Sequence, residues 1–251
     1  MPPRISSELL VIASILNLSV FACVPVVSPQ TTSKQAEATV HLKDDSDWWS
    51  ITKGFEHGEN VKSQERELPP GSFQIVGVKL GDELLADAQE RLGPATAVER
   101  GDAGEWRRQI CYVVAGESAN TYLIFETGEI DRAFYLFNGA PWKGQDSCSA
   151  TNLVPGKLAT GSGLHIGESP AEIIAMLGKP SGQREGELVY LVEYRKRNSA
   201  EELKELRKKV PAMSDEEFAK SLAVADLTAI VVLKFAESKL NYIAVSKSET
   251  Y

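Results

Sequence analysis

One sequence pattern occurs twice in this chain, and it constrains the fold more than any other feature. The first copy spans residues 80–94 and the second residues 166–180; each opens with an apolar residue and a glycine and closes with Leu-Gly followed by a proline. Gly81 precedes Gly93 by twelve positions, and Gly167 precedes Gly178 by eleven. A tandem repeat predicts two similar supersecondary units rather than one irregular domain.

Each copy predicts a short helix. Ser169, with Pro170 after it and Glu172 three residues on, is typical of a helix N-cap, and we expect Asp82 to cap the first copy in the same way. The leucine-glycine pair and the proline beyond it indicate where each helix ends. The apolar residues at helical spacing, which predict one apolar face, are Leu84, Leu85, Ala88 and Leu92 in the first copy and Ile173, Ile174 and Leu177 in the second.

After each helix the apolar residues recur with a period of two, which indicates strands that the helix covers. In the first copy Phe125 precedes Ile130 by five positions, as Phe235 precedes Leu240 in the second, and Thr127-Gly128 predicts a tight hairpin turn. The predicted strands are 105–114, 121–126 and 130–137 in the first copy and 187–196, 227–235 and 240–246 in the second.

These motifs carry a resemblance to a known family. Gly81 with Leu92-Gly93-Pro94, Gly167 with Leu177-Gly178-x-Pro180, and the closing Phe-x4-(Ile/Leu) resemble the pattern of the SmpA/OmlA family and of the related β-lactamase-inhibitor-protein fold. That family includes the small lipoprotein of the outer-membrane β-barrel assembly machine, and the related fold is that of a secreted inhibitor with two such units in tandem. The resemblance covers residues 73–137 and 163–246 and implies a helix-on-antiparallel-sheet unit that binds protein.

Residues 1–22 predict an export signal. Arg4 supplies a positive start, and residues 9–22 form an uncharged run of fourteen, which is short for a bilayer span. The run ends in Val-Phe-Ala-Cys, which resembles a bacterial lipobox, so we expect Cys23 to carry lipid. An ordinary secretory signal cut near Ala22, or a retained anchor, is the alternative. Val24 resembles the sorting signal of outer-membrane lipoproteins, which predicts the periplasmic side of the outer membrane.

Residues 23–72 predict the lipidated cysteine and a flexible tether, because the stretch after Cys23 is rich in proline, serine and threonine and poor in apolar residues. Trp48 and Trp49 are the exception. Two adjacent tryptophans either dock back onto the first domain, the reading we favour, or anchor a partner.

The three cysteines predict one disulfide. With Cys23 assigned to lipid, Cys111 and Cys148 remain, and an oxidising compartment favours their pairing. Two buried thiols, or a redox or metal site, are the alternatives; the chain has no C-x-x-C spacing and no histidine near either cysteine that would favour them.

The fold class that we expect is α+β, with two tandem helix-on-antiparallel-sheet domains, 73–150 and 163–251, after the signal and the tether. A Gly/Pro/Ser-rich connection at 138–162 separates them. The second domain departs from the family pattern by an inserted helical hairpin at 199–224, since Ser199 and Ser214 each precede a glutamate by three residues. Its interleaved charges favour solvated helices over an anion or lipid-headgroup site.

The residues favour no catalytic or metal chemistry. His41, His57 and His165 are scattered, so we expect no metal site and no cofactor. Ser50-x-x-Lys53 matches the S-x-x-K nucleophile pattern, but its S-D-N and K-T-G companions are missing. A net charge of −8 disfavours nonspecific nucleic-acid binding.

The sequence therefore predicts an exported, lipid-anchored bacterial envelope protein that is no enzyme and acts as a protein-binding module or scaffold, with envelope assembly as the role that the resemblance implies. The expected partner is another envelope protein. A periplasmic inhibitor or immunity protein that blocks a toxin or an envelope hydrolase is the alternative. An enzyme is the third, and it would need a pocket with convergent titratable groups.

Period-two alternation also suggests where a partner binds. We expect Trp106 and Tyr112 on strand 105–114, and Tyr190 and Tyr194 on strand 187–196, to lie on the open face of the sheet and to anchor the partner. Packing of the same aromatics in the core is the alternative.

Overall fold

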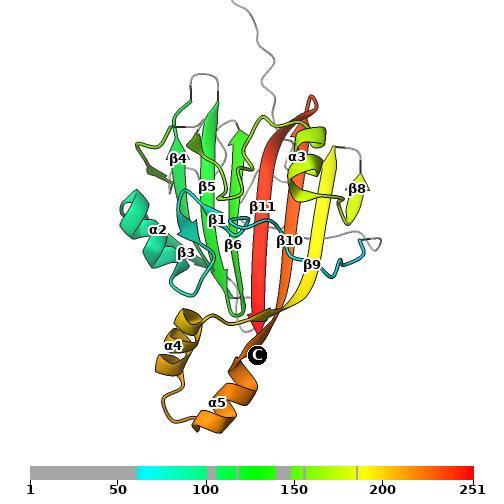
Figure 1. Ribbon diagram of the computed structural model, residues 1–251. Helices are drawn as coiled ribbons and strands as arrows, with labels where there is room; N and C mark the ends of the chain where they lie inside the picture. Colours follow the sequence, from blue (N-terminus) through cyan, green and yellow to red (C-terminus); the bar gives the residue numbers. More distant parts are fainter. Residues whose placement is uncertain (1–60, 101–105, 117–118, 140–147, 155–156, 185) are drawn as a thin grey trace, which may run out of the picture. The chain divides into compact units, whose positions relative to one another are not determined.

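The computed structural model describes residues 61–100, 106–116, 119–139, 148–154, 157–184 and 186–251 (Figure 1). The chain divides into two compact units, Met1–Gln35 and Ala36–Tyr251, and every described residue belongs to the second. The predicted signal at 1–22 and the predictions for Cys23, Trp48, Trp49, His41, His57, Ser50 and Lys53 lie outside the described residues.

The described part of the chain contains helices and a mainly antiparallel sheet, which confirms the predicted α+β class. The helices are α2 (Leu84–Leu92), α3 (Pro170–Leu177), α4 (Ala200–Lys209) and α5 (Asp215–Leu222). The strands are β1 (Gln74–Ile75), β2 (Val78–Lys79), β3 (Ala97–Arg100), β4 (Arg107–Val114), β5 (Asn120–Gly128), β6 (Asp131–Gly139), β7 (Ser149–Ala150), β8 (Gly182–Arg184), β9 (Glu187–Arg197), β10 (Val224–Ala236) and β11 (Lys239–Thr250).

The strands of both repeats form one sheet. Its order is β3-β4-β5-β6-β11-β10-β9-β8, with β7 paired to β4, and β1 and β2 form a separate two-stranded hairpin. The last strand of each repeat pairs with that of the other, from Tyr242 opposite Phe137 to Ser248 opposite Asp131. The two repeats are therefore halves of a continuous nine-stranded sheet, and the prediction of two separate tandem domains is not confirmed.

The two repeat helices begin differently. Ser169 and Glu172 form the predicted capping box on α3, with Pro170 as its first residue. The N-cap of α2 is Glu83, without a side-chain cap, so the prediction that Asp82 caps this helix is wrong. The Asp82 carboxylate is instead paired with Lys209 and with Arg132. The helix ends agree with the prediction, since the glycine after each helix has a positive φ, 97° in the first repeat and 79° in the second.

Both repeat helices pack on the same face of the sheet (Figure 1). Leu84 and Ala88 of α2 and Ile173 and Leu177 of α3 belong to one buried apolar cluster with strand residues from both halves. Ile174, which the sequence places on the apolar face of α3, is 36% exposed, because it lies about 100° around the helix from Ile173.

Tyr112 and Tyr190 occupy the same position in the two repeats. Each ring is fully buried on the helix-covered face, and each hydroxyl donates to the carbonyl of the glycine that ends the repeat helix: Tyr112 to Gly93 at 2.8 Å and Tyr190 to Gly178 at 3.1 Å. The prediction that these two tyrosines lie on an open binding face is therefore wrong. Each satisfies an orphan carbonyl at a helix end.

The other two predicted anchors, Trp106 and Tyr194, are half-buried. Tyr194 packs against the same helix-covered cluster. It therefore lies on the side of the sheet that the helices cover, and not on an open face.

The predicted disulfide is confirmed: the sulfurs of Cys111 and Cys148 lie 1.96 Å apart. The strand that follows Cys148 pairs in parallel with the strand of Cys111, and the amide of Thr151 donates to the carbonyl of Val113 at 3.1 Å. The disulfide and this short pairing hold the segment after β6 against β4.

The helical hairpin is inserted between β9 and β10 as predicted. Ser199 and Glu202 form a capping box on α4, and the Ser214 hydroxyl accepts from the amide of Glu217 on α5. The second helix ends at Leu222, before the predicted 224, because Val224 already pairs with Arg197 in the sheet.

The turn in the first repeat lies two residues later than predicted. Thr127 still pairs with Arg132, and Gly128 belongs to β5, so the turn falls on Glu129 and Ile130. Ile130 is 63% exposed as a result.

Candidate functional site

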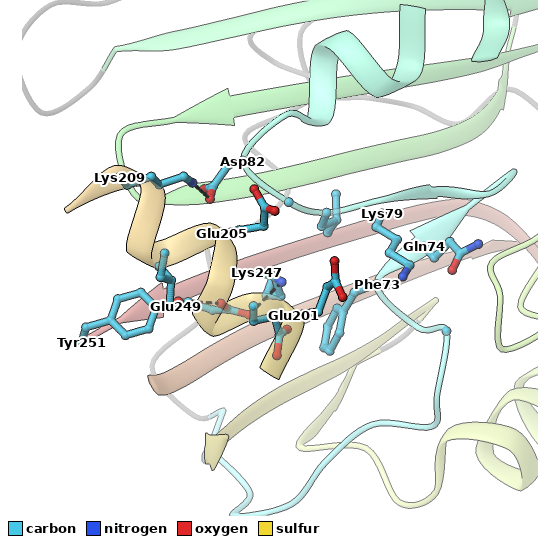
Figure 2. A pocket seen from close by; sticks show the side chains of 15 residues that line it. Phe73, Gln74, Lys79, Asp82, Glu201, Glu205, Lys209, Lys247, Glu249 and Tyr251 are labelled. Atoms are coloured by element: carbon cyan, nitrogen blue, oxygen red, sulfur yellow. Dashed lines mark hydrogen bonds and ion pairs between the residues drawn. The ribbon is translucent and has the colours of Figure 1, made fainter. Parts of the chain in front are cut away.

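A cleft of about 420 Å³ lies between α4 and the sheet (Figure 2). Three segments line it: the loop and strands at 71–82, helix α4, and the end of β11. The apolar lining side chains are Phe73, Leu80, Leu206 and Tyr251; the charged ones are Lys79, Asp82, Glu201, Glu202, Glu205, Lys209, Lys247 and Glu249.

The sequence of the insertion places α4 at this end of the sheet. Asn198 is buried just before the helix, and its side-chain amide donates to the carbonyl of Leu222 at 2.8 Å. This bond joins the start of the hairpin to its end. Because β9 and β10 pair up to the residues that flank the hairpin, the helices can leave the sheet only at this point.

Ion pairs connect the first turn of α4 to the sheet. The Lys196 ammonium, at the end of β9, pairs with Glu202 of the helix and lies 3.5 Å from Glu249 of β11. Lys247 lies 2.9 Å from the same Glu249 carboxylate. Glu249 thus accepts from two lysines, Lys196 at the end of β9 and Lys247 on its own strand β11.

The last turn of α4 is held by a second set of charges (Figure 2). Lys209 pairs with Asp82 in the loop before α2, and Arg132 of β6 lies 3.6 Å from the same carboxylate. The hydrogen bond from Lys209 lowers the pKa of Asp82 below its usual range. The cleft is therefore bounded by an ion-pair cluster at each end of α4.

Glu202 and Lys196, at the other end of α4, are also charged at neutral pH. Desolvation raises the pKa of Glu202, but the hydrogen bonds from Lys196 and Ser199 outweigh it and lower that pKa to about 2. Desolvation lowers the pKa of Lys196, and its bond to Glu202 and its attraction to Glu249 outweigh this, so the pKa is raised. The paired groups are thus fixed as charges.

The cleft offers a ligand both exposed charged groups and aromatic surface. Glu201 and Lys79 are exposed, and among the described residues neither has an ion-pair partner. Phe73 is half-buried, with the Lys247 ammonium 6.0 Å from its ring centroid, and Tyr251 is 53% exposed. The arrangement presents apolar surface between charges and can hold an apolar side chain together with a charged neighbour.

None of the four aromatic residues that the sequence singled out lines this cleft. Sequence reasoning located the inserted hairpin but expected its charges to be solvated, whereas Lys209 and Glu202 pair with the rest of the molecule. Lys209 and Asp82 are 127 residues apart in the chain, and no local spacing relates them. The one sequence signal that could have pointed to this cleft was the insertion itself, because it departs from the repeat pattern.

Among the described residues, no group of three or more histidine, cysteine, aspartate or glutamate side chains is arranged to hold a metal ion. In the same part of the chain, no helix has the length and apolar character needed to cross a membrane. Comparison of the chain with protein-family models, with curated proteins and with solved structures finds no match.

Proposed function

We propose that the protein is an exported, non-catalytic protein-binding module of the bacterial envelope, and that it holds a segment of a partner protein in the cleft beneath α4. The cleft carries the proposal: exposed Tyr251 and half-buried Phe73 and Leu206 lie between ionised side chains. Aromatic and apolar anchors surrounded by a charged rim are typical of protein-binding surfaces. Exposed Glu201 on the rim favours a partner segment with a basic side chain beside its apolar anchor.

The protonation states in the cleft support recognition rather than catalysis. A general acid or base works best when its pKa lies near the operating pH. In this cleft the pKa of Glu202 is about 2, the pKa of Asp82 is lowered and that of Lys196 is raised, so all three are displaced away from neutrality. Groups of this kind hold a fixed charge and select a complementary one.

Export and anchoring belong to the same proposal. The Cys111–Cys148 disulfide suits an oxidising compartment, which supports the signal expected at residues 1–22. With acylated Cys23 the protein would lie on the periplasmic side of the outer membrane. We expect the mature chain to begin at Cys23 with acyl mass and to partition with membranes, and Cys23→Ser to abolish that partitioning; an unmodified N-terminus elsewhere would contradict the anchor.

A second candidate function is inhibition of a toxin or an envelope hydrolase. One observation favours it: the repeats form a continuous nine-stranded sheet, and the resemblance implies a tandem arrangement of such units in a secreted inhibitor. The equivalent bonds of Tyr112 to Gly93 and of Tyr190 to Gly178 support the inference that the two halves are copies of one unit.

Site-specific photo-crosslinking tests the cleft. A photoreactive residue in place of Leu206 in the cleft should capture a partner from the envelope of the producing cell, while the same residue at Ile174, which is exposed on α3, should not. Glu201→Lys should weaken the capture, whereas Glu216→Lys, the same charge change on exposed α5, should leave it unchanged. Equal capture at positions 206 and 174 would exclude the cleft as the binding site.

The captured protein then separates the two candidate functions. A scaffold should capture an assembly factor whose activity it leaves intact. An inhibitor should capture a hydrolase or toxin whose activity falls when the purified protein is added at equimolar concentration.

A further inference from the structure

The second face of the sheet, opposite the face that α2 and α3 cover, is also apolar and buried. Tyr122, Tyr135 and Tyr242 are 0% exposed and Phe137 is 1% exposed, and they form a cluster separate from the one beneath the helices. The rings of Tyr122 and Phe137 are stacked with centroids 5.2 Å apart, and Phe137 lies 6.1 Å from Tyr242. These rings extend over β5, β6 and β11, in the middle of the sheet.

A buried carboxylate lies on the same face. Glu126 is 5% exposed; it accepts from Gln109 and, at 3.0 Å, from the Tyr135 hydroxyl, and the Arg107 Nε lies 3.8 Å away. Burial raises the pKa of Glu126. Groups of the sheet itself satisfy this carboxylate, so the apolar rings are the part of the face that calls for a cover.

The described helices do not supply this cover. The buried residues of α2 and α3 belong to the other cluster, and α4 and α5 lie beyond the ends of β9 and β10 (Figure 1). Because a sheet face left open to solvent exposes its side chains, the burial of these rings points to a cover other than the described helices.

The start of the described chain lies at the edge of this same face. Val61 packs against the Tyr122 cluster, and a Cβ added to Gly182 of β8 would lie 3.0 Å from the Val61 side chain. Gln64 then pairs with the outer edge of β9, through bonds to Leu191 and Glu193. The sixty residues before Val61 thus join the sheet beside the face that needs a cover.

Within those residues, 48–55 (WWSITKGF) carries four large apolar side chains at a distance that fits. Trp49 is twelve residues from Val61, which allows roughly 40 Å in an extended chain. Five strand spacings separate β8 from β5, a span of roughly 24 Å at the usual distance between strands. Alternation of side chains would place Trp49, Ile51, Lys53 and Phe55 on one side of the segment and Trp48 on the other.

We propose that residues 48–55 cover the second face of the sheet in cis, with Trp49, Ile51 and Phe55 packed on the cluster of Tyr122, Phe137 and Tyr242. Trp48 faces outward.

Photo-crosslinking in the full mature chain tests the proposal without removing the aromatic packing. A photoreactive phenylalanine derivative at position 49 should link within the molecule to peptides of β5, β6 and β11, and the same residue at position 48 should not. Links from both positions only to other proteins would overturn the proposal in favour of a partner anchor.

Matched alanine variants give a second measurement. Trp49→Ala should raise amide hydrogen exchange in β5, β6 and β11 by roughly tenfold or more and increase binding of a hydrophobic dye, while Trp48→Ala should leave both unchanged. Unchanged exchange in Trp49→Ala would overturn the proposal. The proposal would also be overturned if Trp142→Ala raised hydrogen exchange in these strands and Trp49→Ala did not. That result would assign the cover to the connection between β6 and β7.

Discussion

The hydroxyls of Tyr112 and Tyr190 show how one residue type repeats a structural role. Both rings are buried, and both hydroxyls donate to the carbonyl at the end of a repeat helix. Burial raises the pKa of each tyrosine to about 12. Each residue thus connects a strand to the helix that covers it, and its aromatic character serves folding rather than binding.

Removing only the hydroxyl should therefore reduce stability. Tyr112→Phe and Tyr190→Phe should each lower the free energy of unfolding by about 1 kcal/mol in urea titrations, and Tyr251→Phe, with its exposed ring, should be neutral. Because the folded pKa is raised above 10.0, the tyrosines contribute stability that is present below pH 10 and lost as the pH rises toward 12. A neutral effect at both positions would contradict this role.

The contribution of Glu126 to folding stability should depend on pH in the opposite sense to that of the surface acids. Burial raises its folded pKa, so its contribution to stability is present below the unfolded pKa of about 4.3 and is lost as the pH rises through the folded pKa. Glu126→Gln keeps an acceptor for Tyr135 and removes the charge. At pH 7 the variant should be at least as stable as the parent by thermal unfolding, and the difference should disappear near pH 4; greater stability of the parent at pH 7 would contradict this.

At the scale of elements, α4 is the part that departs from the repeat. The ion pairs of Lys196 with Glu202 and of Lys209 with Asp82 connect both of its ends to the rest of the molecule. None of its own residues is fully buried, so these charges, rather than apolar packing, position it. We therefore expect the shape of the cleft to depend on pH and ionic strength.

Protonating Glu202 should loosen α4. The folded pKa of about 2 lies below the unfolded value, so the contribution of Glu202 is present above pH 4.3 or so and is lost as the pH falls toward 2. Glu202→Gln should raise hydrogen exchange in α4 at pH 7, and this difference from the parent should shrink on acidification. Glu216→Gln on α5 is the control and should have no effect; an unaltered exchange rate in Glu202→Gln would show that other contacts position the helix.

At the scale of the whole molecule, β6 and β11 combine two repeats into a single sheet. Neither half has a complete set of neighbours for its last strand without the other. Cooperative unfolding of both halves follows, because separating them would expose the buried residues of both strands.

The disulfide tests that cooperativity. Cys111 and Cys148 are separated by 37 positions, so removing the bond by Cys111→Ala with Cys148→Ala should cost about 4 kcal/mol by loop-closure entropy. Because the sheet is continuous, the loss should lower the midpoint of one transition that includes both repeats. Two separate calorimetric transitions, with only the midpoint of the first repeat lowered, would show that the halves unfold independently.

Local signals in the sequence were sufficient for the elements. The capping residues Ser169 and Ser199, the helix-ending glycines and the period-two runs predicted the helices and strands closely, and export chemistry with cysteine count predicted the disulfide. The signals for the helices and strands depend on residues within a few positions of one another, and the prediction of the disulfide depends on the expectation that Cys23 carries lipid, which leaves one possible pair. The first helix cap was the exception, because Asp82 is engaged by Lys209 from a distant segment.

Only the tertiary structure decided which face of each strand lies beneath the helices and which lies on the second face of the sheet. Alternation divides a strand into two faces, but in β4 and β9 both faces are apolar, so the pattern could not tell that Tyr112 and Tyr190 lie beneath the helices while Cys111 and Val189 lie on the second face. The cleft is likewise a product of long-range contact, since the segment at 71–82 lies more than a hundred residues before the helix α4 that faces it. Periodicity reports that a side chain is buried; its partner is determined by how the strands are ordered in the sheet.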